Sequence, residues 1–173
     1  MNRSMSLMQA VTKRYLNMTV LVWDGSSLAT DRQANDGSAK WESSKAWYVT
    51  IDNEVCIVSG VGLLDDIIKM REWIKQSGIP QEFPALTSKS ELIVVRRDTG
   101  LWLYEGIPFP VHCGFNARAF GHGKDFAYGA VAMGANAQQA VEASNMFCLH
   151  CGKGVEVFNL NGEGNEKENN KEG

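Results

Sequence analysis

The sequence has 173 residues, which is the length of one domain with a substantial buried core. Hydrophobic residues make up 44% of the chain and charged residues 21%, as in ordinary globular proteins. The net charge of -3 and the lack of a basic run argue against a nucleic-acid-binding protein. No apolar run approaches the roughly 20 residues that a membrane-spanning helix needs, so we expect no membrane partner.

The two ends of the chain differ in character from its middle. Residues 1–17 lack the continuous apolar segment of a secretory signal, so residues 1–18 are interpreted as a leader, either a propeptide or a start-site extension. Without such a signal, the four cysteines are expected to be reduced thiols in a cytoplasmic protein. Residues 161–173 contain no apolar side chain and predict a disordered acidic tail. The folded domain is therefore expected at residues 19–160.

In chain order, the first predicted elements are two hairpins and a helix. Residues 19–23 and 28–31 form a hairpin around the turn residues "DGSS", and the polar stretch 32–40 is expected to be a loop. A second hairpin covers residues 46–60. Apolar side chains at helical spacing then predict a helix in 63–78, ended by Gly78 and Pro80.

The second half continues the same alternation. A third hairpin is predicted over 91–106, and one short strand in 107–115. Residues 121–147 predict two helical segments separated near 134–136, and 154–160 a final strand. Strands in antiparallel pairs and helices in blocks indicate an α+β fold, with sheets covered by helices. No glycine-rich phosphate loop follows a strand, and we expect no cofactor.

The first hairpin brings a hydroxyl towards a carboxylate. A three-residue loop at 24–26 pairs Trp23 with Ser27 and places Thr19 directly opposite Asp31, with Cβ atoms about 4.5–5.5 Å apart. A two-residue turn would make the two residues diagonal neighbours, unless a bulge restored the pairing. Lys45, just before the next strand, is in position to bring an ammonium group to the same place.

A threonine at the start of a chain has the parts needed for acyl transfer. Its α-amine has an unperturbed pKa of about 7.7–8.0, so it can act as the general base for its own hydroxyl. A nearby lysine lowers that pKa further, and an aspartate orients both groups. An amide nitrogen is not a base, so this chemistry requires the Met18–Thr19 bond to be broken. The alternative to a catalytic role is that Thr19 has only a structural role, because threonine is common in β-strands.

Several segments together resemble the proteasome β-subunit and HslV peptidase family. They are "MTVLVWDGSSLATDRQ", "SKAWYV", "VSGVG" and "GHGKDFAYGAVAMGANAQQAVEA…CGKGVEVFNL", which span residues 18 to 160. The strongest segment is the glycine-flanked one before the Ala/Gly-rich helix. The sequence is most like the compact proteasome-like proteins of phages and bacteria. The resemblance implies a four-layer αββα sandwich with an N-terminal nucleophile.

The resemblance also implies roles for particular residues. Thr19 would be the nucleophile, Asp31 the aspartate after the first hairpin, and Lys45 the lysine, with Lys40 as the second choice. The "VSGVG" segment would supply the backbone N–H of the oxyanion hole, with Gly60 the first candidate and Ser59 the next. It further implies a threonine-type endopeptidase that acts on peptides or unfolded proteins, assembles as a homo-oligomeric ring and accepts substrates from an ATP-dependent unfoldase.

Two features depart from the family pattern. The family commonly has a serine where this chain has His122, which is either a substitute polar group at the active site or a loop residue without a chemical role. The number of residues between Thr19 and Asp31 is also smaller than in typical proteasome subunits, as a shorter first hairpin would explain. Two alternatives to the peptidase therefore remain: a catalytically inactive structural subunit of the same family, and an amidase of the same class that acts on small molecules.

The segment "CLHC", with Cys148, His150 and Cys151, has ligand types suited to zinc. Its spacing to His112 and Cys113 fits no standard zinc pattern, however. Buried thiols and a surface histidine are the favoured interpretation, and we expect no metal.

Overall fold

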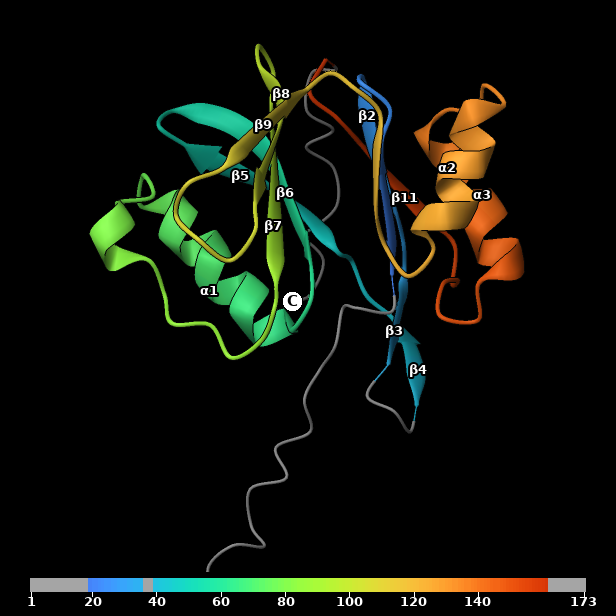
Figure 1. The fold of residues 1–173 in the computed structure, drawn as a ribbon, viewed down its shortest axis with the longest axis horizontal. Coiled ribbons are helices and arrows are strands. Elements are labelled where there is room, and N and C mark those ends of the chain that lie inside the picture. The colour runs from blue at the N-terminus through green and yellow to red at the C-terminus, as the bar shows by residue number, and fades with distance from the viewer. Residues whose placement is uncertain (1–18, 36–38, 162–173) are drawn as a thin grey trace, which may run out of the picture.

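The computed structural model describes residues 19–35 and 39–161, so the predicted leader and nearly all of the predicted tail lie outside it. The described chain forms four layers: helix α1, a five-stranded sheet, a four-stranded sheet and the pair α2 and α3 (Figure 1). This is the predicted four-layer αββα sandwich. None of the described helices is long and apolar enough to cross a membrane.

The four-stranded sheet is antiparallel throughout and contains the first hairpin. Its order is β10 (Arg118–Gly121), β1 (Val20–Trp23), β2 (Ser27–Asp31) and β11 (Val155–Asn159). Side chains alternate between the two faces of a strand. Leu21 and Trp23 therefore pack into the space between the sheets, while Val20 and Val22 pack under the helices. Because β1 is an inner strand, both of its edges are paired.

The five-stranded sheet follows the chain order and is a continuous meander. It consists of β5 (Ala46–Ile51), β6 (Glu54–Val61), β7 (Glu91–Arg96), β8 (Gly100–Tyr104) and β9 (Val111–Gly114). The β5–β6 turn uses Asp52 and Asn53, both at positive φ, as a type I′ hairpin requires. Helix α1 (Leu64–Lys75) buries Ile67, Met70 and Trp73 against the outer face of this sheet. The short helix η1 (Pro80–Glu82) follows it.

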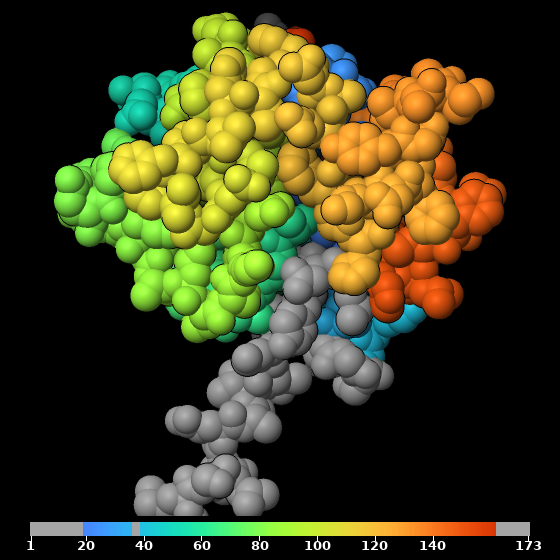
Figure 2. All heavy atoms as spheres, viewed as in Figure 1, coloured from blue at the N-terminus to red at the C-terminus, as the bar shows by residue number. Residues whose placement is uncertain are grey.

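Helices α2 (Lys124–Ala132) and α3 (Ala137–Phe147) cover the other sheet. Alanine side chains at the contact, Ala127, Ala137 and Ala140, are fully buried and let the helices lie close to the strands. Asn136 is the N-cap of α3 and so ends the connection between the helices. Its side chain accepts a hydrogen bond from the Gln139 backbone N–H, as part of a capping box. Figure 2 shows the yellow-green surface of the β7–β9 region beside the orange surface of α2 and α3.

Three predictions about the strands were wrong or incomplete. The β1–β2 register pairs Trp23 with Leu28, one residue beyond the prediction, because the Asp24 carboxylate accepts from the backbone N–H of Ser26 and of Ser27 and lengthens the turn. The stretch predicted as a polar loop contains β3 (Gln33–Asn35) paired with β4 (Lys40–Glu42). Strand β10 was not predicted, and it forms by pairing with β1.

Candidate active site

Three side chains from three elements meet in the interior at one end of the β1–β2 hairpin. Thr19 precedes β1, Asp31 ends β2, and Lys45 precedes β5 in the opposite sheet; all three are fully buried. The Thr19 hydroxyl donates to Asp31 Oδ1 at 2.6 Å. Lys45 Nζ donates to Thr19 Oγ1 at 2.8 Å and to Asp31 Oδ1 at 2.7 Å. The sequence-predicted set is therefore one connected hydrogen-bond network.

The route by which Asp31 reaches Thr19 differs from the predicted one. Continuing the observed register places Asp31 opposite Val20 rather than opposite Thr19. The carboxylate reaches the hydroxyl diagonally across the end of the hairpin, and its Oδ1 also accepts from the Val20 N–H at 3.0 Å. Proximity is preserved because a carboxylate offers two oxygens with several acceptor directions.

Backbone amides hold the other oxygen of Asp31. Oδ2 accepts from the N–H of Gln33 and from the N–H of Gly152, each at 3.2 Å. Gly152 lies just before β11, so a segment from the end of the domain contributes to the site. A buried carboxylate needs such hydrogen-bond partners. These donors could not be predicted from the sequence, because every residue except proline has a backbone N–H and residue type does not show where it points.

Lys45 is a buried cation inside the protein. Burial lowers the pKa of its ammonium group, while the adjacent Asp31 charge opposes that shift. The Ser59 hydroxyl donates to the Lys45 carbonyl at 2.7 Å and so fixes the backbone from which the side chain extends. Lys40, the second choice in the sequence, lies on exposed β4 and donates to the Leu149 carbonyl at 3.4 Å. The structure thus brings Lys45, and not Lys40, to Thr19.

The oxyanion-hole candidates lie beside Lys45. The β5–β6 register pairs Ala46 with Ser59, which places Gly60 opposite Lys45. A Cβ at Gly60 would lie 2.7 Å from the Glu91 carbonyl oxygen and 2.9 Å from Ile67. Only glycine therefore lets α1 and β7 approach this closely.

The segment around His122 contacts Thr19 through its backbone. Gly121 has φ +85°, and a Cβ there would lie 2.3 Å from the Thr19 carbonyl oxygen, while the Gly123 N–H donates to that oxygen at 3.3 Å. The His122 ring packs edge-to-face on His150, with ring centroids 5.1 Å apart. The two glycines that flank His122 therefore pack directly against the Thr19 backbone.

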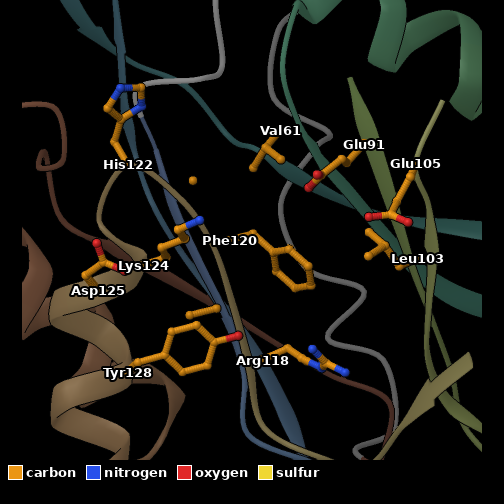
Figure 3. A pocket seen from close by; sticks show the side chains of 12 residues that line it. Val61, Glu91, Leu103, Glu105, Arg118, Phe120, His122, Lys124, Asp125 and Tyr128 are labelled. Carbon is orange, nitrogen blue, oxygen red and sulfur yellow. The ribbon is translucent and has the colours of Figure 1, made fainter. Parts of the chain in front are cut away.

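A cleft of about 820 Å³ opens next to these glycines, between the two sheets. Figure 3 shows Val61, Glu91, Leu103 and Glu105 on one side, with Arg118, Phe120, Lys124 and Tyr128 facing them. The β7–β8 register continues to place Glu91 opposite Glu105. Burial and the Glu105 charge raise the pKa of the Glu91 carboxyl group. Gly121 and His122, which line the cleft, belong to the segment that packs against the Thr19 backbone.

Among the described residues, no group of three or more His, Cys, Asp or Glu side chains is placed to hold a metal ion. Cys148 and Cys151 are free thiols, as are Cys56 and Cys113.

No protein-family model matches the sequence, and no curated protein matches it at a significant level. Solved structures do match the fold. HslV from Trypanosoma brucei superposes with a TM-score of 0.58 at 17% identity, over 81% of this chain and 97% of that chain. BPH from Thiobacillus denitrificans, in complex with epoxomicin, gives a TM-score of 0.56 at 16% identity, over 81% and 96%. An Anbu mutant from Hyphomicrobium sp. strain MC1 gives a TM-score of 0.62 at 9% identity, over 80% of each chain.

The chain has the HslV- and Anbu-like fold. These likenesses confirm the architecture that the sequence predicted, and they extend across most of the described residues. The Thr19 network joins the two sheets of that architecture, because Thr19 and Asp31 flank the β1–β2 hairpin and Lys45 precedes β5.

Proposed function

We propose that the protein is a threonine-type peptidase in which Thr19, once it is the first residue, is the nucleophile. The observation that carries the proposal is the contact of Lys45 Nζ with Thr19 Oγ1 at 2.8 Å, in a fully buried network closed by Asp31. A lysine that donates to the hydroxyl oxygen favours the development of negative charge on that oxygen. An aspartate on the same ammonium keeps the buried cation paired.

The proposed reaction uses the amine that cleavage of the Met18–Thr19 bond would expose. The amine removes the proton from Thr19 Oγ1 as this oxygen attacks the peptide carbonyl carbon, and the proton then passes to the leaving amine. An ester on Oγ1 remains, and water hydrolyses it with the same amine as base. A backbone N–H at Gly60, or at Ser59, is the proposed donor to the oxyanion.

The proposed substrates are extended peptides and unfolded proteins. Thr19 is fully buried in the uncleaved chain, so a substrate can reach Oγ1 only after the Met18–Thr19 bond is broken, and an extended chain then needs a smaller opening than a folded protein does. We further propose a ring of identical subunits in the cytoplasm, fed by an ATP-dependent unfoldase, because the fold is shared with HslV. Size measurement in solution tests the ring, and degradation of an unfolded protein but not of its folded form tests the substrate class.

Covalent labelling is the direct test of the nucleophile. Epoxomicin, the ligand in the BPH complex, is a suitable probe for a protein prepared with Thr19 as its first residue. We expect one adduct on Thr19, none on a Thr19→Ala variant, and none on a protein that retains residue 18. Native material that keeps residues 1–18 and never labels would instead support the inactive structural subunit. Labelling with turnover of small amides but no peptides would support the amidase.

A further inference from the structure

The segment that holds Asp31 Oδ2 also contains two cysteines in contact with each other. Cys148 ends α3 and is half-buried, while Cys151 is buried against Val20 and the other residues under the helices. The Cys151 N–H donates to the Cys148 carbonyl at 3.2 Å, which closes a four-residue turn. Such a turn brings its end Cα atoms within about 7 Å, and a disulfide needs about 4.4–6.8 Å.

The two sulfur atoms differ in access. Burial, followed by hydrogen bonding with the Cys148 thiol, raises the pKa of the Cys151 thiol, so Cys151 remains a protonated thiol near neutral pH. Cys148 is partly exposed and can meet an oxidant in solution. A mixed disulfide formed on the accessible Cys148 sulfur would lie next to the Cys151 sulfur, which can resolve it to an internal disulfide.

The turn is joined directly to the Thr19 network. Gly152, the residue after Cys151, donates its N–H to Asp31 Oδ2 at 3.2 Å and accepts from the Arg32 N–H at 3.0 Å. A Cβ at Gly123 would lie 2.8 Å from Cys151 Sγ, so this sulfur packs on the glycine whose N–H donates to the Thr19 carbonyl. A movement of Cys151 therefore acts on contacts of both Asp31 and Thr19.

We propose that Cys148 and Cys151 form a dithiol–disulfide modification site that controls the position of the Gly152 N–H on Asp31. The oxidant is a small disulfide such as oxidised glutathione. The Cys148 thiolate attacks one sulfur of that disulfide and releases the first glutathione thiolate. The Cys151 sulfur then attacks the Cys148 sulfur, and its proton passes to the second glutathione thiolate as this leaves. The protein loses two hydrogen atoms, and the oxidant is reduced to two thiols.

A covalent S–S bond of about 2.05 Å draws Cys151 Sγ towards Cys148. The sulfur then moves away from Gly123, and the following Gly152 N–H shifts relative to Asp31. Because that N–H is one of the hydrogen bonds to a buried carboxylate, its loss is expected to weaken the Asp31 network. The reduced protein is the form with the network described above.

The test begins with the full-length protein in glutathione buffers of graded redox potential, followed by peptide mapping. We expect one internal disulfide between Cys148 and Cys151, abolished in Cys148→Ser. A Cys56→Ala variant is the matched control and should leave the disulfide unchanged, since Cys56 lies in β6 under α1. A stable glutathione adduct on Cys148, or no oxidation of the pair, overturns the proposal.

Amide hydrogen exchange measures the coupling without any enzymatic activity. We expect exchange at Gly152 to become about tenfold faster in the oxidised form and to recover after reduction, as for the loss of one hydrogen bond. If the disulfide is mapped but the exchange rate at Gly152 is unchanged, the proposed effect of the disulfide on the Gly152–Asp31 hydrogen bond is overturned. Slower epoxomicin labelling of Thr19 after oxidation is expected in addition, and that arm rests on the proposed function. A reduced protein that never labels refutes the proposed function alone, because mapping and exchange still test the disulfide.

Discussion

The buried pair of Lys45 and Asp31 predicts a strong energetic coupling that a double-mutant cycle can measure. Lys45→Met keeps the length of the side chain but leaves the Asp31 carboxylate without its cation. Asp31 then retains hydrogen bonds from the Thr19 hydroxyl and from the N–H of Val20, Gln33 and Gly152. We therefore expect a loss near the lower end of the usual range for breaking a buried ion pair, about 3 kcal/mol.

Asp31→Asn should cost more, about 5 kcal/mol, for two reasons. It leaves the Lys45 ammonium buried without a counter-charge, and it turns an amide NH₂ towards backbone donors that need an acceptor. The double variant removes both charges together, so its cost should fall short of the sum by about 2–3 kcal/mol. Urea unfolding at pH 7, analysed for midpoint and slope, measures all three variants.

The pH dependence provides a second check on the same pair. Asp31 raises the pKa of Lys45 in the wild type, so Asp31→Asn lowers this pKa further. The native state then binds fewer protons than the unfolded state up to the ordinary lysine pKa of about 10.4, and its stability must rise with pH over that window. Additive losses at pH 7, or a stability of Asp31→Asn that does not rise between pH 7 and 9.5, would refute the coupling.

Two substitution experiments and one chemical modification test other parts of the molecule. Glu91→Gln should stabilise the protein at pH 7 by about 0.2–1 kcal/mol, because it removes the like charge opposite Glu105. This gain in stability should vanish at a pH low enough to protonate both carboxyl groups. A variant that is less stable than the wild type at pH 7 would contradict this. Gly121→Ala should cost more stability than Gly134→Ala, since both glycines have positive φ but only a Cβ at Gly121 meets the Thr19 carbonyl oxygen; equal losses in thermal unfolding would exclude that contact. Burial raises the pKa of the Cys56 thiol to about 11, so alkylation of native protein at pH 8 should leave Cys56 unmodified until denaturant is added.

Most of the secondary-structure elements could be predicted from the local spacing of apolar residues in the sequence. Alternating apolar residues in the hairpins and helical spacing in 63–78 correspond to β1, β2, β5–β8 and α1. The β1–β2 register was off by one residue, because the Asp24 side chain decides the turn length through hydrogen bonds that residue type alone does not specify. The prediction of proximity was still correct, since the Asp31 carboxylate reaches across the diagonal.

Long-range contacts account for what the sequence did not predict. The four residues of β10 have no distinctive pattern, and they become a strand because β1 offers them a partner about a hundred residues away. Likewise, neither Lys40 nor Lys45 looks like a buried residue, and only the packing of the two sheets places one beside Thr19. The roles assigned to Thr19 and Asp31 came from the family resemblance, with which the fold agrees.

The pairing of β1 has a consequence for the order of events during synthesis. Val20 lies opposite Gly121, and Asp31 needs the N–H of Gly152, so the network around Thr19 cannot close until most of the domain has left the ribosome. At ordinary rates of translation this interval is on the order of ten seconds. Strand β1 is thus synthesised early but completed late, and the nascent chain has no closed Thr19 network during that interval.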